Sequence, residues 1–145
     1  IDFSMIDFKP IATIAEAVRQ AERQLIAQTI DIRYKEAKDI VIISKSLGTI
    51  CAGFLEHFLR DMGVRVRQLY LTPVKETLEY IDDESSVIAL VIGDEDALLS
   101  SSIVEDFAGK RGIRYQIIKG VGHSLKRERE EDSERIILEI AELCR

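Results

Sequence analysis

The sequence predicts an α/β domain, with a mainly parallel sheet sandwiched by helices. Short apolar runs of strand length alternate along the chain with longer segments of helical periodicity, as in successive β-α-β units. The runs Ile40–Ile43 and Val87–Ile92 show no polar alternation, which is typical of parallel strands buried on both faces. With 145 residues and neither a repeat nor a linker, the chain is expected to form one domain, residues 1–145.

Each expected element rests on its own pattern. Stripes of apolar residues at helical spacing indicate helices, and short apolar runs indicate strands. Pro10 suits the start of the first helix, and Gly63 ends the second. The expected elements are a helix over Ile11–Leu25, a strand over Asp39–Ser44, a helix over Leu47–Met62, a strand over Val64–Leu71, a short helix over Thr77–Tyr80, a strand over Ser86–Ile92, a helix over Ser101–Lys110, a strand over Ile113–Ile118 and an amphipathic helix over Ile136–Cys144.

Charge and composition exclude several classes of function. Lys and Arg total 20 against 26 Asp and Glu, and a net charge of −6 argues against nucleic acid as a partner. No apolar run approaches the roughly 20 residues that span a bilayer, so no membrane association is expected. Cys51 and Cys144 form no ligand cluster with His57 and His123, so we expect reduced thiols, no metal, no organic cofactor and a cytoplasmic location.

The residues that follow the strands are the candidate site. In parallel α/β sheets, ligands bind at the carboxyl ends of the strands. Ser46 follows the first predicted strand, Asp94 and Asp96 follow the third, and His123 follows the last, behind two glycines. A serine hydroxyl needs a base such as histidine to become a nucleophile, and that base needs an acid to hold its tautomer. These three residue types therefore predict nucleophilic catalysis by a serine.

The turn around Ser46 suits a nucleophile. A sharp turn from strand to helix pushes a serine side chain out of the sheet, and it requires small residues two positions before and after. Ser44 and Gly48 meet that requirement. The helix that follows directs free N–H groups towards a developing oxyanion, and the Leu47 N–H is the expected donor.

Three segments together resemble the alpha/beta-hydrolase superfamily. "VIISKSLGT" is similar to its nucleophile elbow, "VIGDEDALL" to its acid loop and "KGVGHSL" to its histidine loop. The resemblance covers about residues 36–126 and is specifically to small, uncapped bacterial serine hydrolases. It implies Ser46 as nucleophile, Asp96 rather than Asp94 as acid, His123 as base, and a small-molecule acyl substrate such as a carboxylic ester. The short link from Thr72 to Ser85 leaves no room for a cap domain, so we expect an open site.

Two other functions stay open at this point. A binding or scaffold protein with the same fold would keep the sheet without the activity. An anion binder would use the loop Ser44–Gly48 as a nest for a phosphate ester or nucleotide. The sequence leaves the oligomeric state open as well, with a homo-oligomer as one possibility.

The N-terminal segment suggests that the chain begins inside the fold. Ile1–Ser4 has the pattern of a strand end, and Ile40–Ile43 would have a strand partner on one side alone among the strands found here. We expect upstream strands to complete the sheet and to carry the second oxyanion donor. The alternative is that Ile1–Ser4 itself pairs with Ile40–Ile43.

Overall fold

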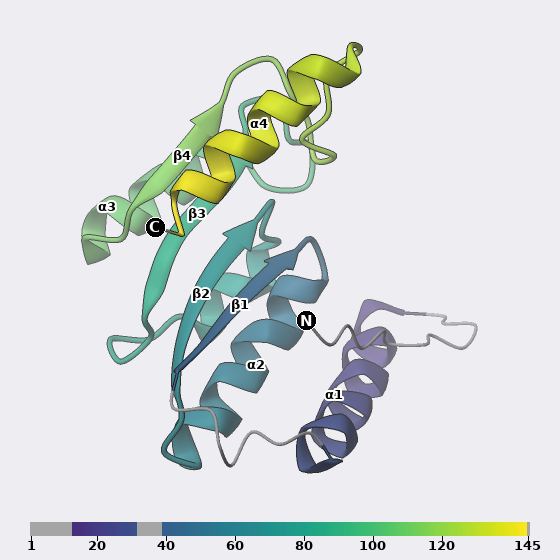
Figure 1. The fold of residues 1–145 in the computed structure, drawn as a ribbon, viewed down its shortest axis with the longest axis vertical. Helices are drawn as coiled ribbons and strands as arrows, with labels where there is room; N and C mark the ends of the chain where they lie inside the picture. Colours follow the sequence, from purple (N-terminus) through teal and green to yellow (C-terminus); the bar gives the residue numbers. More distant parts are fainter. Residues whose placement is uncertain (1–12, 32–38, 145) are drawn as a thin grey trace.

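Strands and helices alternate along the chain as the sequence predicts. The computed structural model describes residues 13–31 and 39–144 (Figure 1). Gly63, with φ +78°, follows the second helix, as expected. The elements in order are α1 (Ile14–Asp31), β1 (Asp39–Lys45), α2 (Gly48–Asp61), β2 (Arg65–Leu71), the 3₁₀ helix η2 (Lys75–Tyr80), β3 (Val87–Gly93), α3 (Ser101–Arg111), β4 (Tyr115–Ile118) and α4 (Glu130–Glu142).

The four described strands form one parallel sheet. Their order is β1-β2-β3-β4, so each pairs with its neighbour in sequence. The register places Lys45 beside Leu71, at the ends of β1 and β2. Because all four strands run the same way, the loops after β1, β3 and β4 emerge at one edge of the sheet. That edge is where the sequence predicts the site.

Helices cover both faces of the sheet, which confirms the predicted sandwich. On one face, Tyr70 and Leu90 pack with Ala52 of α2 and Val104 of α3. On the other face, alternate strand residues pack under α4 (Figure 1). α1 lies against α2, with Ala17 and Ala21 buried. None of the helices in the described ranges has the length and apolar character needed to cross a bilayer.

The prediction that Ile40–Ile43 is buried on both faces is wrong for this structure. Val41 is 40% exposed and Ile43 is 59% exposed, whereas Ile40 and Ile42 pack against α2 and its surroundings. The physical reason is position: β1 is the edge strand of the described sheet, and α4 lies over β3 and β4 (Figure 1). Whether Ile1–Ser4 pairs with this strand lies outside the described residues.

Candidate active site

Ser46 occupies a strained turn between β1 and α2. Its φ is +54°, in the left-handed region, which costs a non-glycine residue roughly 1–3 kcal/mol. The Ser46 N–H donates to the Leu71 carbonyl at 3.1 Å, and the Ser46 carbonyl accepts from the Thr49 N–H at 3.0 Å. The end of β2 and the first turn of α2 therefore hold this turn in place, and they keep the hydroxyl at the carboxyl edge of the sheet.

Asp96 lies beneath the histidine in the loop after β3. Its side chain is fully buried, and its Oδ2 is 2.8 Å from Nδ1 of His123. The other carboxylate oxygen, Oδ1, accepts from the Leu98 N–H at 2.9 Å. Both oxygens are thus occupied, so the orientation of the carboxylate towards His123 is fixed.

Asp94 contacts the loop after β4 at Gly120 and Lys119. Its Oδ1 accepts from the Gly120 N–H at 2.7 Å, and its Oδ2 lies 3.8 Å from the Lys119 ammonium. The side chain therefore ties the loop after β3 to the loop after β4. The structure brings Asp96, and not Asp94, into contact with His123.

His123 connects the acid to the serine. Its Nε2 is 2.7 Å from Ser46 Oγ, and the ring is one quarter exposed. An ionised Asp96 accepts the proton of Nδ1, which leaves the Nε2 lone pair free to accept from the serine hydroxyl. The order Ser46 Oγ, His123 and Asp96 is the geometry that a nucleophile, a base and an orienting acid require.

The two loops that carry Asp96 and His123 pack directly on each other. The Val121 carbonyl accepts from the Glu95 N–H at 3.1 Å and lies against Gly93. Gly120 has φ +68°, a conformation that suits glycine, so the first of the two glycines ahead of His123 marks a special turn.

The first turn of α2 lies beside the serine. Within the described residues, the Leu47 N–H has no hydrogen-bond acceptor, so it is free to donate to a bound substrate. Its role towards an oxyanion stays a prediction.

The expectation that tight packing demands a small residue at Gly48 is wrong for the described surroundings, because a β-carbon there would meet nothing within 4 Å.

Two buried hydroxyls near the turn were not singled out from the sequence. Thr49 Oγ1 donates to the Ser46 carbonyl at 2.5 Å and lies 2.5 Å from Thr77 Oγ1 in η2. The signal available in the sequence was the position of Thr49, one helical turn after the serine. Nothing in the sequence indicates that η2 brings Thr77 to the same place.

The other reactive side chains lie apart from this arrangement. His57 Nε2 lies 2.9 Å from the Tyr80 carbonyl, so this histidine packs against η2. Cys51 is a buried free thiol in α2, and burial raises its pKa, with a smaller contribution from the Glu22 charge. A thiol held protonated is a poor nucleophile.

Across the described ranges, no group of three or more His, Cys, Asp or Glu side chains is placed to hold a metal ion.

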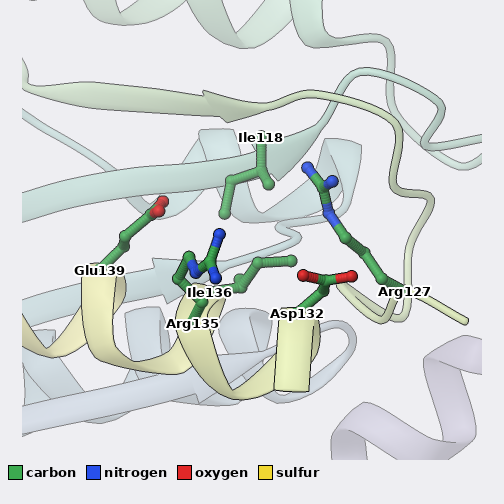
Figure 2. Close-up of a pocket in the computed structure, with 6 residues that line it drawn as sticks. All are labelled: Ile118, Arg127, Asp132, Arg135, Ile136 and Glu139. Atoms are coloured by element: carbon green, nitrogen blue, oxygen red, sulfur yellow. The ribbon is translucent and has the colours of Figure 1, made fainter. Parts of the chain in front are cut away.

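A small cavity lies between β4 and α4, and Ser46, Asp96 and His123 are not among its lining residues. Figure 2 shows side chains of α4 facing Ile118 of β4, with Arg127 across the opening. Arg127 donates to the Lys119 carbonyl at 2.8 Å and so closes the base of the loop that carries His123. The cavity measures about 160 Å³, and its lining residues are Ile118, Arg127, Asp132, Arg135, Ile136 and Glu139.

Comparison with known proteins identifies the fold. No protein-family model matches the sequence, and no curated protein matches it. Solved structures do match. A CIB-like hydrolase from Thermoplasma acidophilum, itself described as predicted, superposes with a TM-score of 0.58 at 19% identity over 86% of this chain. An alpha-beta serine hydrolase homologue from Coxiella burnetii gives 0.61 at 14% identity over 93%.

This chain has the alpha/beta-hydrolase fold. A further alpha/beta-hydrolase enzyme, MGS-MChE2 from a sediment metagenome of the Mar Chica lagoon in Morocco, superposes with a TM-score of 0.54 at 14% identity over 82% of this chain. The chain spans 59% of the Thermoplasma protein, 60% of the Coxiella protein and 68% of MGS-MChE2. In this alpha/beta-hydrolase fold, Ser46, Asp96 and His123 meet at the carboxyl edge of the sheet, where the sequence places them.

Proposed function

We propose that this protein is a serine hydrolase that cleaves a carboxylic ester or a similar acyl bond of a small molecule. One observation carries the proposal: His123 Nε2 lies 2.7 Å from Ser46 Oγ while its Nδ1 lies 2.8 Å from Asp96. A buried acid, a histidine and a serine in line are what acyl transfer needs, and each group has a chemical task in it.

In the acylation step, Ser46 Oγ attacks the carbonyl carbon of the substrate while its proton passes to His123 Nε2. Asp96 stabilises the imidazolium that forms, and the Leu47 N–H donates to the oxyanion of the tetrahedral intermediate. The imidazolium then gives its proton to the leaving alcohol as the carbon–oxygen bond breaks. An acyl group remains as an ester on Ser46.

In the deacylation step, water attacks the acyl-enzyme. His123 takes a proton from the water, the oxyanion forms again beside the Leu47 N–H, and the proton returns to Ser46 Oγ as the acid product leaves. No metal or organic cofactor takes part in either step. The link between β2 and β3 is only the short segment that contains η2, so we infer an open site for small or exposed acyl groups.

The alternative is a binding or scaffold protein with the same fold. It draws support from the described residues, among which the Leu47 N–H is the donor that we assign to the oxyanion and no second donor is assigned. Losing one such donor costs about 3–4 kcal/mol of transition-state stabilisation. A site with a single oxyanion donor would therefore turn over slowly even with a reactive Ser46.

A panel of short-chain aryl esters tests the proposal. We expect hydrolysis above the background rate by the wild-type protein and none by a folded S46A variant. Fastest turnover of acetyl and butyryl esters is expected for an open site. Equal rates for the wild type and S46A on every ester would favour the scaffold instead.

A further inference from the structure

Two threonines from different elements meet beneath the serine. Thr49 in α2 and Thr77 in η2 are 28 positions apart, yet their hydroxyl oxygens are 2.5 Å from each other and both residues are fully buried. Thr49 Oγ1 is also 2.5 Å from the Ser46 carbonyl oxygen. A continuous line of hydrogen bonds therefore runs from η2 to the backbone of Ser46.

The direction of this line follows from counting protons. A hydroxyl has one proton to donate, and a carbonyl oxygen can only accept. Thr49 must therefore donate its proton to the Ser46 carbonyl, and the bond between the two threonines must be donated by Thr77. The order of donation is Thr77 to Thr49 to Ser46.

The Ser46 carbonyl and the Leu47 N–H belong to the same planar peptide group. A donor on the carbonyl oxygen draws electron density from the amide, so the N–H at the other end becomes a stronger donor. The same bonds also fix the plane of the peptide, and with it the direction of the Leu47 N–H. The Thr49 N–H adds a second donor on the same oxygen, at 3.0 Å.

We propose that Thr49 and Thr77 are positioning residues for the oxyanion site: their hydroxyls orient and polarise the Ser46–Leu47 peptide, whose N–H donates to the oxyanion. This inference rests on the proposed serine-hydrolase function. It gives η2 a part in the reaction without contact with the substrate. It also accounts for two hydroxyls that are buried completely beside a strained turn.

Steady-state kinetics of the variants T49V and T77V test the proposal with an aryl ester. We expect T49V to lower kcat about tenfold with KM unchanged, because the bond acts on the transition state and one full oxyanion donor is worth about 10²–10³. T77V leaves the bond between Thr49 and Ser46 in place, so a loss of about threefold is expected. T49S and T77S keep the hydroxyls and should restore the wild-type kcat.

Thr72 offers a matched control. It is fully buried, and its hydroxyl has no hydrogen-bond partner in the described part of the chain. T72V removes a buried threonine hydroxyl of the same kind, so it should leave kcat near the wild-type value. If T49V and T77V behave like T72V in an active protein, the proposal is overturned.

A readout that needs no turnover separates this inference from the proposed function. In T49V, the ¹³C resonance of the Ser46 carbonyl should move upfield and the ¹⁵N resonance of Leu47 should shift, because a hydrogen bond to that carbonyl is lost. If T49V shows the shifted resonances but an unchanged kcat, the proposed role of Thr49 and Thr77 in catalysis is overturned. If the wild-type protein neither hydrolyses esters nor reacts at Ser46, the proposed function is overturned even when T49V shows the resonance shift. The catalytic role of Thr49 and Thr77 is then overturned as well.

Discussion

Gly93 at the end of β3 lies so close to Val121 that a β-carbon added to the glycine would stand 2.0 Å from the Val121 carbonyl oxygen. The backbone of the loop after β4 therefore rests directly on the end of β3. This contact fixes the separation between the acid loop and the histidine loop, and hence the reach of His123 towards Ser46. The backbone contact between Gly93 and Val121 thus helps to set the positions of the Ser46, Asp96 and His123 side chains.

The first prediction concerns this contact. Gly93→Ala forces the two loops apart, so we expect a loss of about 2–3 kcal/mol in the free energy of unfolding and a large loss of the proposed aryl-ester hydrolysis. Denaturant unfolding and the aryl-ester assay measure the two effects. Gly109→Ala in α3 is the control, because a β-carbon there meets nothing within 4 Å and should stabilise the helix slightly. Equal behaviour of the two variants would contradict the account.

The second prediction separates the two aspartates after β3. Asp96→Asn removes the charge that holds the Nδ1 proton of His123, and we expect kcat to fall by orders of magnitude. Asp94→Asn keeps an oxygen that can accept from the Gly120 N–H, so its effect should be small. Comparison of kcat for the two folded variants is the measurement. A larger loss in Asp94→Asn would show that the acid is assigned wrongly.

The third prediction is the dependence of the rate on pH. Acylation needs the Nε2 lone pair of His123, and a protonated imidazole cannot accept the serine proton. The rate should therefore fall once the pH is low enough to protonate this imidazole. Circular dichroism at each pH excludes unfolding as the cause. A rate that stays constant down to the pH at which the protein unfolds would contradict a histidine base.

The fourth prediction concerns a buried carboxyl away from the site. Glu56 in α2 is 1% exposed, and burial raises its pKa, although the Ser86 N–H donates to it and Arg60 lies 3.8 Å away. Folding therefore shifts this carboxyl towards its neutral form relative to the unfolded chain, so its contribution to stability is present at low pH and is lost as the pH rises through the raised pKa. Glu56→Gln keeps the acceptor for Ser86 and removes the buried charge.

At pH 8 we expect Glu56→Gln to unfold at a higher urea concentration than the wild type, with a free energy of unfolding about 1–2 kcal/mol larger. Near pH 4 the two proteins should have the same free energy of unfolding. The new amide can also donate towards Gln68, whose Oε1 has no partner in the described part of the chain. Glu84→Gln is the control, because Glu84 also faces Arg60 but is 79% exposed. A less stable Glu56→Gln at pH 8 would mean that the attraction to Arg60 outweighs the cost of burial.

The sequence predicts the fold and the three site residues for a physical reason. Apolar runs set the strands, and parallel strands bring their carboxyl ends to one edge, so the residues after β1, β3 and β4 had to converge. Ser46, Asp96 and His123 follow from that rule together with the resemblance of the three loops.

Other features lie beyond the reach of the sequence because they depend on neighbours distant along the chain. The apolar run at Val41 and Ile43 does not reveal which element covers it, and in the described structure none does. The contact between Thr49 and Thr77 depends on how η2 packs on α2. Likewise, the need for glycine at Gly93 appears only once Val121 lies against it.

The most direct test of the central claim is whether Ser46 reacts as an activated nucleophile. A fluorophosphonate probe bonds covalently to a serine only when a base activates its hydroxyl. Intact-protein mass spectrometry with peptide mapping should show a single label at Ser46 in the wild type, none in S46A and strongly slowed labelling in D96N. A folded wild-type protein that stays unlabelled, or one labelled equally after S46A, would contradict the account.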